Sequence, residues 1–143
     1  MGERDPSNPG FLGPATDLED RSMAVFSRDV QSASDARAWL GSFLHRHHVD
    51  GRYCEDAILV VSELVTNALL HGAGATVLRV RISPESLLLA VTDSADGLPA
   101  VLNREPDTIG GLGLVIVTRL SQDWGVTPFP GGKTVWATLA RSA

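Results

Sequence analysis

The sequence has 143 residues, a formal net charge of −5 and a hydrophobic fraction of 43%. This length fits one compact domain, and the composition is that of a globular protein able to bury a core. The acidic balance argues against a general surface for nucleic acids or anionic membranes, because both require clustered positive charge. The one cysteine, Cys54, excludes an intramolecular disulfide. Neither a signal peptide nor a run of ~20 apolar residues is evident, so we expect a soluble, cytoplasmic protein.

The first half of the chain is predicted to be a leader, a strand and two helices. Residues 1–20 combine prolines and glycines without hydrophobic periodicity, which predicts a flexible leader before a single domain over residues 21–143. A short strand is expected at 23–27. Apolar residues spaced i, i+3, i+4 predict an amphipathic helix that follows Ser34 and Asp35, its candidate N-caps.

The second predicted helix is the longer one. It runs from about Tyr53 to His71 and ends at Gly72, a suitable C-cap. Because it is apolar on most sides, we expect it to be central and mostly buried.

The next segment is predicted to be a hairpin. Residues 76–82 alternate between apolar and polar side chains, residues 83–86 form a turn, and residues 87–93 form a second strand. One face of this hairpin carries Arg79 and Arg81 and is expected to face solvent.

The last third is predicted as a loop over 94–110, a helix from Leu112 to about Asp123, a turn-forming cluster over 128–132 and a final strand over 134–140. This order predicts an α+β fold. We expect a two-layer sandwich, in which a mixed, mostly antiparallel sheet carries the helices on one face.

The strongest polar pattern lies in the second helix. Glu63, Asn67 and His71 are spaced i, i+4, i+8 and therefore follow one slowly drifting stripe. A carboxylate and an amide are costly to bury without partners, and a metal–phosphate site would provide them. An Asn carbonyl oxygen suits Mg²⁺, and a Glu one turn earlier can accept a proton from an attacking water or hydroxyl. The alternative is an ordinary exposed polar stripe.

A second pattern ends the hairpin. Asp93 has the same strand parity as Leu87, Leu89 and Val91, so its carboxylate continues the inward apolar face and needs a donor there. The exocyclic amine of adenine is one candidate, and a backbone N–H of the following turn is the other. Gly97, without a Cβ, would let the backbone lie flat against a ring.

A third pattern is glycine-rich. Gly110, Gly111 and Gly113 precede a predicted helix, where exposed N–H groups and the helix dipole favour phosphate, although a flexible helix entry is the alternative. A Rossmann fingerprint is excluded, because its third glycine position holds Ile116. Residues 132–134 (GKT) are similar to the end of a P-loop, but no glycine occupies the required first position.

In this order the patterns resemble the GHKL (Bergerat-fold) ATPase superfamily over about residues 22–140. The matching segments are 63–72 (ELVTNALLHG) for its N box, 93–97 (DSADG) and 110–114 (GGLGL) for its glycine boxes, and 132–134 for its late Gly-x-Thr segment. Within the superfamily, the short length and the run 60–67 (VVSELVTN) resemble the anti-sigma-factor serine kinases.

The resemblance implies ATP and Mg²⁺ as cofactors and suggests a role for each matching position. Glu63 would be the general base, and Asn67 would bind the nucleotide as the Mg²⁺ ligand. Asp93 would accept a hydrogen bond from the adenine amine, with Gly97 beside the ring and Thr134 in support. The remaining nucleotide-binding positions would be His71, Gly110, Gly111, Leu112, Gly113 and Leu114, with residues 98–110 as the ATP lid.

The resemblance also implies a function. The chain would be an ATP-binding anti-sigma regulatory factor with serine/threonine kinase activity toward an anti-sigma antagonist. Its partners would be a sigma factor and that antagonist, and a homodimer is usual for similar proteins. The alternative is a non-catalytic partner-binding regulator that uses ATP only structurally or has lost it. We expect no direct nucleic-acid or membrane partner.

Overall fold

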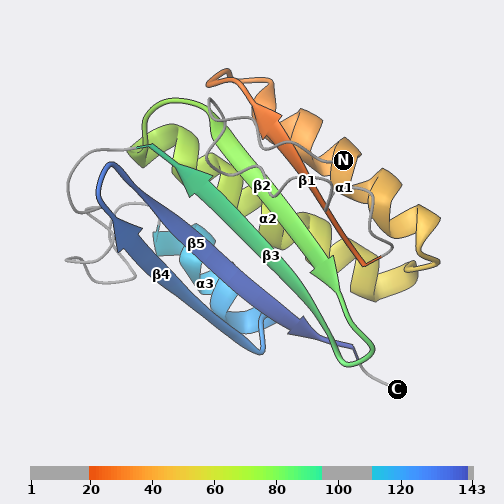
Figure 1. The fold of residues 1–143 in the computed structure, drawn as a ribbon. Coiled ribbons are helices and arrows are strands. Elements are labelled where there is room, and N and C mark those ends of the chain that lie inside the picture. The colour runs from red at the N-terminus through yellow and green to blue at the C-terminus, as the bar shows by residue number, and fades with distance from the viewer. Residues whose placement is uncertain (1–19, 95–110, 142–143) are drawn as a thin grey trace.

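A computed structural model describes residues 20–94 and 111–141, which form a sheet with helices packed on one of its faces (Figure 1). The predicted leader, 1–20, lies outside these residues except for Asp20. In chain order the elements are β1 (Arg21–Phe26), α1 (Ser32–Arg46), α2 (Gly51–His71), β2 (Thr76–Ile82), β3 (Ser86–Asp93), α3 (Gly111–Leu120), β4 (Asp123–Phe129) and β5 (Gly132–Ala140). Of the described helices, none is both long and apolar enough to cross a bilayer.

The sheet has the strand order β1-β2-β3-β5-β4. Each neighbouring pair of strands in the described part of the chain is antiparallel. The predicted α+β class and the one-sided helix layer are therefore confirmed, while the described sheet is antiparallel throughout rather than mixed. The topology places β3 and β5 side by side, although they are far apart in the chain.

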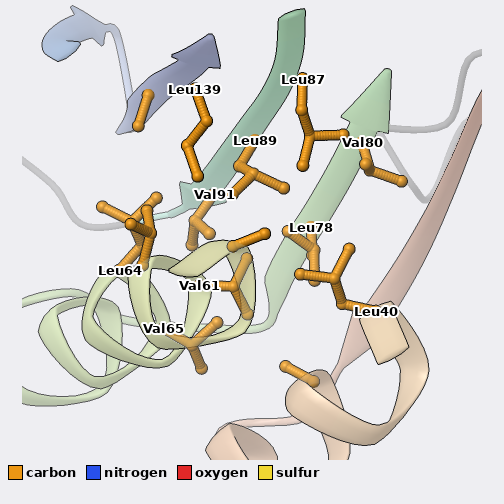
Figure 2. Packing of buried hydrophobic residues seen from close by; sticks show 14 of the residues in the cluster. Leu40, Val61, Leu64, Val65, Leu78, Val80, Leu87, Leu89, Val91 and Leu139 are labelled. Carbon is orange, nitrogen blue, oxygen red and sulfur yellow. The ribbon is translucent and has the colours of Figure 1, made fainter. Parts of the chain in front are cut away.

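The core fills the space between the sheet and the helices (Figure 2). It is built from alternate residues of β2, β3 and β5 together with one side of α1 and α2. The side chains labelled in Figure 2 are at most 2% exposed: Leu40, Val61, Leu64, Val65, Leu78, Val80, Leu87, Leu89, Val91 and Leu139. Burial of one such side chain stabilises the fold by roughly 1.5–3 kcal/mol. This burial decides which face of each strand meets the helices.

The helices differ from their predicted bounds and burial in a few respects. Helix α1 begins at Ser32, so Ser34 and Asp35 lie inside its first turn and are not its caps. Asp29 sets this earlier start, because its backbone carbonyl accepts from Ser32 N at 2.9 Å. Helix α2 packs against α1, α3 and the sheet. Its remaining side is open, however, and there Leu59 is 42% exposed and Leu70 65% exposed.

Strand β4 was not expected. The sequence predicts helix to about residue 123 and then turn-forming residues, whereas α3 ends at Leu120 and β4 begins at Asp123. Pro128 is tolerated because β4 is an edge strand, where a proline need not donate to a ladder. The indole ring of Trp136 packs against Gly125, where a Cβ would lie 2.8 Å from its Cζ2 atom and would not fit.

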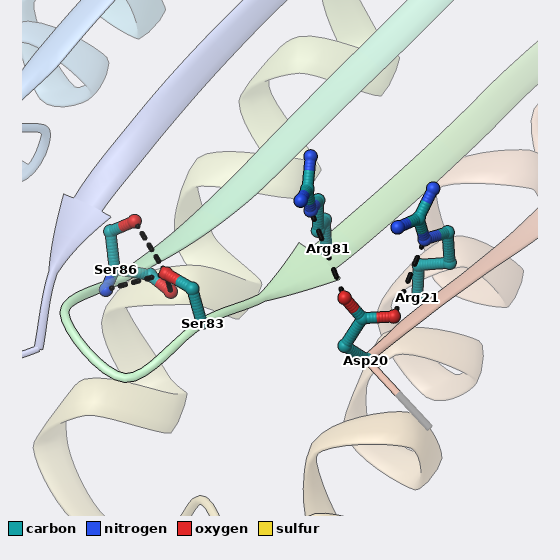
Figure 3. A network of polar contacts seen from close by, with 5 residues as sticks. All are labelled: Asp20, Arg21, Arg81, Ser83 and Ser86. Carbon is teal, nitrogen blue, oxygen red and sulfur yellow. Dashed lines mark hydrogen bonds and ion pairs between the residues drawn. The ribbon is translucent and has the colours of Figure 1, made fainter. Parts of the chain in front are cut away.

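Polar contacts stabilise the end of the β2–β3 hairpin and the start of β1 (Figure 3). The backbone N–H of Ser86 donates to Oγ of Ser83 at 3.2 Å, which closes the predicted turn. The carboxylate of Asp20 lies 3.3 Å from Nε of Arg21 and 3.8 Å from Nε of Arg81. These ion pairs are solvent-accessible, so each contributes little to stability.

Candidate functional site

The candidate site lies where the C-terminal end of α2 meets the end of β3 and the start of β5. Asp93 is the last residue of β3, and its register partner on β5 is Lys133. Gly72 is the C-cap residue of α2 and lies next to Asp93. A Cβ on Gly72 would lie 2.6 Å from Cγ of Asp93, so the carboxylate packs against the helix end where a side chain would not fit.

Asp93 and Lys133 form a buried ion pair. Nζ of Lys133 donates to Oδ2 of Asp93, and both side chains are 2% exposed. The inward orientation predicted for Asp93 is therefore confirmed. Lys133, however, was not among the donors that the sequence suggested. Lys133 alternates in step with the buried Val135 and Ala137, so the sequence indicates that its side chain points inward. The sequence does not show, however, that β5 pairs with β3 and so brings Lys133 to Asp93.

Thr134 occupies a different position from the one that the resemblance implies. Its Oγ1 lies 2.7 Å from Oγ1 of Thr92, its register partner. Neighbouring residues of a strand point to opposite faces of the sheet, so Thr134 faces away from Asp93. The described contact of the Asp93 carboxylate on β5 is with Lys133, whereas the hydroxyl of Thr134 contacts Thr92. The supporting role of Thr134 at the adenine stays a prediction.

The polar stripe of α2 leads toward the Asp93 end of the site. Glu63, Asn67 and His71 are each half-buried. These side chains are therefore less desolvated than expected for a mostly buried helix, because the side of α2 that carries Leu59 and Leu70 is open. At ~1.5 Å per residue, Glu63 lies about 14 Å along the helix axis from Gly72. A ligand that contacts both Asp93 and Glu63 must be extended along α2.

The second glycine box begins a helix. Helix α3 starts at Gly111, so Gly111, Leu112 and Gly113 supply backbone N–H groups of its first turn. Leu114 follows them and is 4% exposed, which anchors the helix start in the fold. Helix α3 packs beside α2. Gly97, Gly110 and the predicted lid over 98–110 lie outside the described residues.

These residues fit a nucleotide with Mg²⁺. A buried carboxylate suits an amine donor, and a helix N-terminus favours phosphate. In the described ranges, no three His, Cys, Asp or Glu side chains gather into a metal site. A Mg²⁺ ion here would therefore depend on the Asn67 amide together with phosphate and water oxygens, which is its usual coordination.

Comparisons with known proteins bear on the family and the fold of the chain. A family model described as "Histidine kinase-like ATPase domain" matches residues 26–139, from the end of β1 to the end of β5. Among solved structures, the crystal structure of the RsbU and RsbW domains of Rv1364c from Mycobacterium tuberculosis matches with a TM-score of 0.66 and 21% identity. A search of curated proteins gave no match.

The structural match covers 86% of this chain and 33% of that chain, so this chain spans about a third of the length of that protein. At this identity the match establishes a shared fold. The family model, in contrast, extends over most of the chain and includes the described site residues. On that ground the chain belongs to the histidine kinase-like ATPase domain family, whose cofactor is ATP.

Proposed function

We propose that this chain is an ATP-binding anti-sigma regulatory factor with serine/threonine kinase activity toward an anti-sigma antagonist. One observation carries the proposal: the buried Asp93 carboxylate packs against Gly72 at the C-terminal end of α2, the helix that carries Glu63 and Asn67. Family membership supplies the nucleotide. The similarity of residues 60–67 to the anti-sigma-factor serine kinases supports the choice of branch, as does the shared fold with a chain that contains an RsbW domain.

The proposed roles follow the arrangement of the site. Asp93 accepts a hydrogen bond from the 6-amino group of adenine. Asn67 holds Mg²⁺, and the first turn of α3, at Gly111–Gly113, receives phosphate oxygens. ATP supplies the phosphoryl group that is transferred. Glu63 accepts the proton of the serine or threonine hydroxyl on the antagonist.

Partner binding is the second part of the proposal. The partners are a sigma factor and its antagonist, as the resemblance implies. Exposed apolar side chains on the helix layer are suited to such contacts: Leu59, Leu70 and Val115 are 42%, 65% and 37% exposed.

Calorimetric titration with Mg-ATP tests the nucleotide site. We expect the wild type to bind, and Asp93→Asn and Asn67→Ala to weaken binding at least about tenfold, because a hydrogen bond to a charged group contributes ~1.5–3 kcal/mol. Asp35→Asn removes an exposed carboxylate on α1 and is the matched control. Failure of the wild type to bind at millimolar nucleotide would overturn the ATP-dependent function.

Phosphotransfer is tested with γ-labelled ATP and an extract of the cells that produce the protein. We expect a labelled serine or threonine, located by mass spectrometry. The label should be lost with Glu63→Gln, which keeps ATP binding, and retained with Glu55→Gln, a control at an exposed position of α2. Nucleotide binding without any labelled protein would contradict the kinase activity and leave the non-catalytic regulator.

A further inference from the structure

Two hydrogen bonds in series connect strand β4 to helix α3. Nε1 of Trp124 donates to Oγ1 of Thr118 at 2.8 Å, and this hydroxyl donates in turn to the backbone carbonyl of Leu114 at 2.8 Å. A hydroxyl carries one proton and two lone pairs, so it can take part in both bonds at once. The connection therefore runs from the edge strand to the residue that directly follows Gly113.

The other described contacts of α3 leave this connection a particular task. Among the described elements, α3 packs mainly on α2 and β4, with Leu114 and Val117 buried. Its C-terminal end is tied to the sheet, because the backbone N–H of Gln122 donates to the carbonyl of Thr138 at 2.7 Å. Apolar contacts have no preferred direction, whereas a hydrogen bond requires a definite distance and angle. The Trp124–Thr118 bond thus restricts how far the helix can turn about its axis.

The orientation of α3 matters for the proposed nucleotide site. The helix starts at Gly111, and the backbone N–H groups of a first turn have no partner within their helix. They bind phosphate oxygens only when they are aimed at them, since a hydrogen bond weakens steeply as its angle leaves the preferred range. Thr118 is exposed and could bond to water instead, so its bond to Trp124 adds little to the stability of the fold. A role in orientation gives this bond a purpose.

We propose that Trp124 is a positioning residue of the nucleotide site: through Thr118 it holds the first turn of α3, Gly111–Gly113, in the orientation that binds the phosphates of ATP. Trp124 acts through the helix and does not itself contact the nucleotide. This inference rests on the proposed ATP site. It adds to that site a residue of the edge strand that lies outside the four segments matching the superfamily.

Calorimetric titration of the full chain with Mg-ATP tests the inference. Thr118→Val removes the hydroxyl, keeps the shape of the side chain and lies at an exposed position, so we expect it to fold. It should weaken Mg-ATP binding about three- to tenfold, the effect of one lost hydrogen bond. Thr118→Ser retains the hydroxyl and should bind Mg-ATP like the wild type. Trp124→Phe should weaken binding to a similar extent as Thr118→Val, and the double variant no more than the weaker single variant, because both changes break the same connection.

Thr138→Val and Trp39→Phe are the matched controls. The hydroxyl of Thr138 lies on β5 and contacts the carbonyl of Asp123 on β4 at 3.4 Å, while the ring of Trp39 stacks on Phe43 within α1. Neither side chain makes a described hydrogen bond to α3. Both variants should therefore leave the Mg-ATP affinity unchanged, whatever free energy of unfolding urea denaturation gives for them.

The indole N–H of Trp124 provides a readout that does not depend on affinity. Its NMR signal is assigned by its loss in Trp124→Phe. In the wild type it should shift when Mg-ATP is added, because phosphate binding and the orientation of α3 are coupled in both directions. In Thr118→Val this proton should exchange with water faster than in the wild type, since its acceptor is gone.

The outcomes separate this inference from the proposed function. Faster indole exchange in Thr118→Val with an unchanged Mg-ATP affinity would make the connection purely structural and overturn the inference, while the ATP site would stand. Unchanged exchange would show that the bond is not formed and would overturn it as well. Equal weakening by the two control variants would also contradict it, because any loss of stability would then suffice. Absence of Mg-ATP binding by the wild type would overturn both proposals together.

Discussion

The hydroxyl oxygens of Thr92 and Thr134 lie 2.7 Å apart across β3 and β5, on the face of the sheet away from the helices. Nη2 of Arg79 donates to the same Thr92 oxygen at 3.1 Å. These two hydrogen bonds thus connect β2, β3 and β5. They lie one residue away from the Asp93–Lys133 pair, on the opposite face of the sheet. The Thr92–Thr134 contact therefore lies on the opposite face of the sheet from Asp93, for which we propose a contact with the nucleotide.

Thr134→Val should therefore affect stability and not binding. Loss of the Thr92–Thr134 hydrogen bond is expected to lower the free energy of unfolding by about 1 kcal/mol, measured by urea denaturation. The Mg-ATP affinity should be unchanged, because the hydroxyl faces away from Asp93. Thr138→Val, whose hydroxyl makes a longer contact of 3.4 Å with the Asp123 carbonyl, should have a smaller effect on stability. A marked loss of ATP affinity in Thr134→Val would contradict the placement of this side chain.

Gly72→Ala should disturb the site through Asp93. The added Cβ would lie 2.6 Å from Cγ of Asp93 and 2.7 Å from the backbone oxygen of Ala68, so the carboxylate or the helix end must shift. We expect the Mg-ATP affinity to fall at least about tenfold, since a hydrogen bond weakens steeply when its distance and angle leave the preferred range. A loss of stability of about 1–3 kcal/mol should accompany this change.

The control for that substitution is Gly41→Ala. Gly41 lies inside α1, where an added Cβ would meet only Cδ1 of Ile58 at 3.7 Å, an ordinary contact. Replacing a helical glycine by alanine favours the helix by about 1 kcal/mol. Gly41→Ala should thus leave ATP affinity unchanged and stability equal or higher. Equal affinities for the two glycine variants would contradict the close packing of Gly72 on Asp93.

Two leucines of α2 test the orientation of the helix. Leu64 is 1% exposed and belongs to the core, whereas Leu70 is 65% exposed on the open side. Leu64→Ala should lower the free energy of unfolding by about 2–5 kcal/mol, because it leaves a cavity. Leu70→Ala should change it by about 0.5 kcal/mol or less. Similar losses in both variants, compared by urea denaturation, would show that α2 is turned differently from the arrangement described.

Tyr53 should titrate at unusually high pH. Burial raises the pKa of Tyr53 to about 12, with Arg141 as a smaller opposing influence. Its hydroxyl donates to the carbonyl of Leu139 at 3.1 Å. A pKa that is higher in the folded state favours the protonated form, so this stabilisation is complete below pH ~10 and is lost as pH rises toward ~12.

The measurement is simple because the chain has one tyrosine. The ultraviolet absorbance of tyrosinate therefore follows Tyr53 alone. We expect a midpoint near pH 12 in the folded protein and near ~10 in concentrated urea. Tyr53→Phe should remove the corresponding part of the alkaline loss of stability. The same midpoint with and without urea would rule out the burial of this hydroxyl.

Much of the fold could be predicted because its signals are local. The i, i+4 spacing defines α2, and the alternation of β2 and β3 shows which residues face the helices. The sequence does not predict β4, because Gly125 and Pro128 are residues that usually interrupt a strand. In the structure Pro128 is tolerated because β4 is an edge strand, and Gly125 is tolerated because the ring of Trp136 packs against it. Burial was overestimated for the polar stripe of α2, because the sequence does not show how many sides of a helix its neighbours cover.

Two features of the site follow from local sequence repeats. The helical repeat predicts the polar stripe of Glu63, Asn67 and His71, and the strand repeat predicts the inward direction of Asp93. The position of β3 beside β5 is visible in the folded chain alone, and so is the register that pairs Asp93 with Lys133 and turns Thr134 to the other face. That register joins residues 40 positions apart in the chain. Packing of the whole sheet against the helices sets it, because a slip of one residue would turn every buried side chain of a strand toward the opposite face.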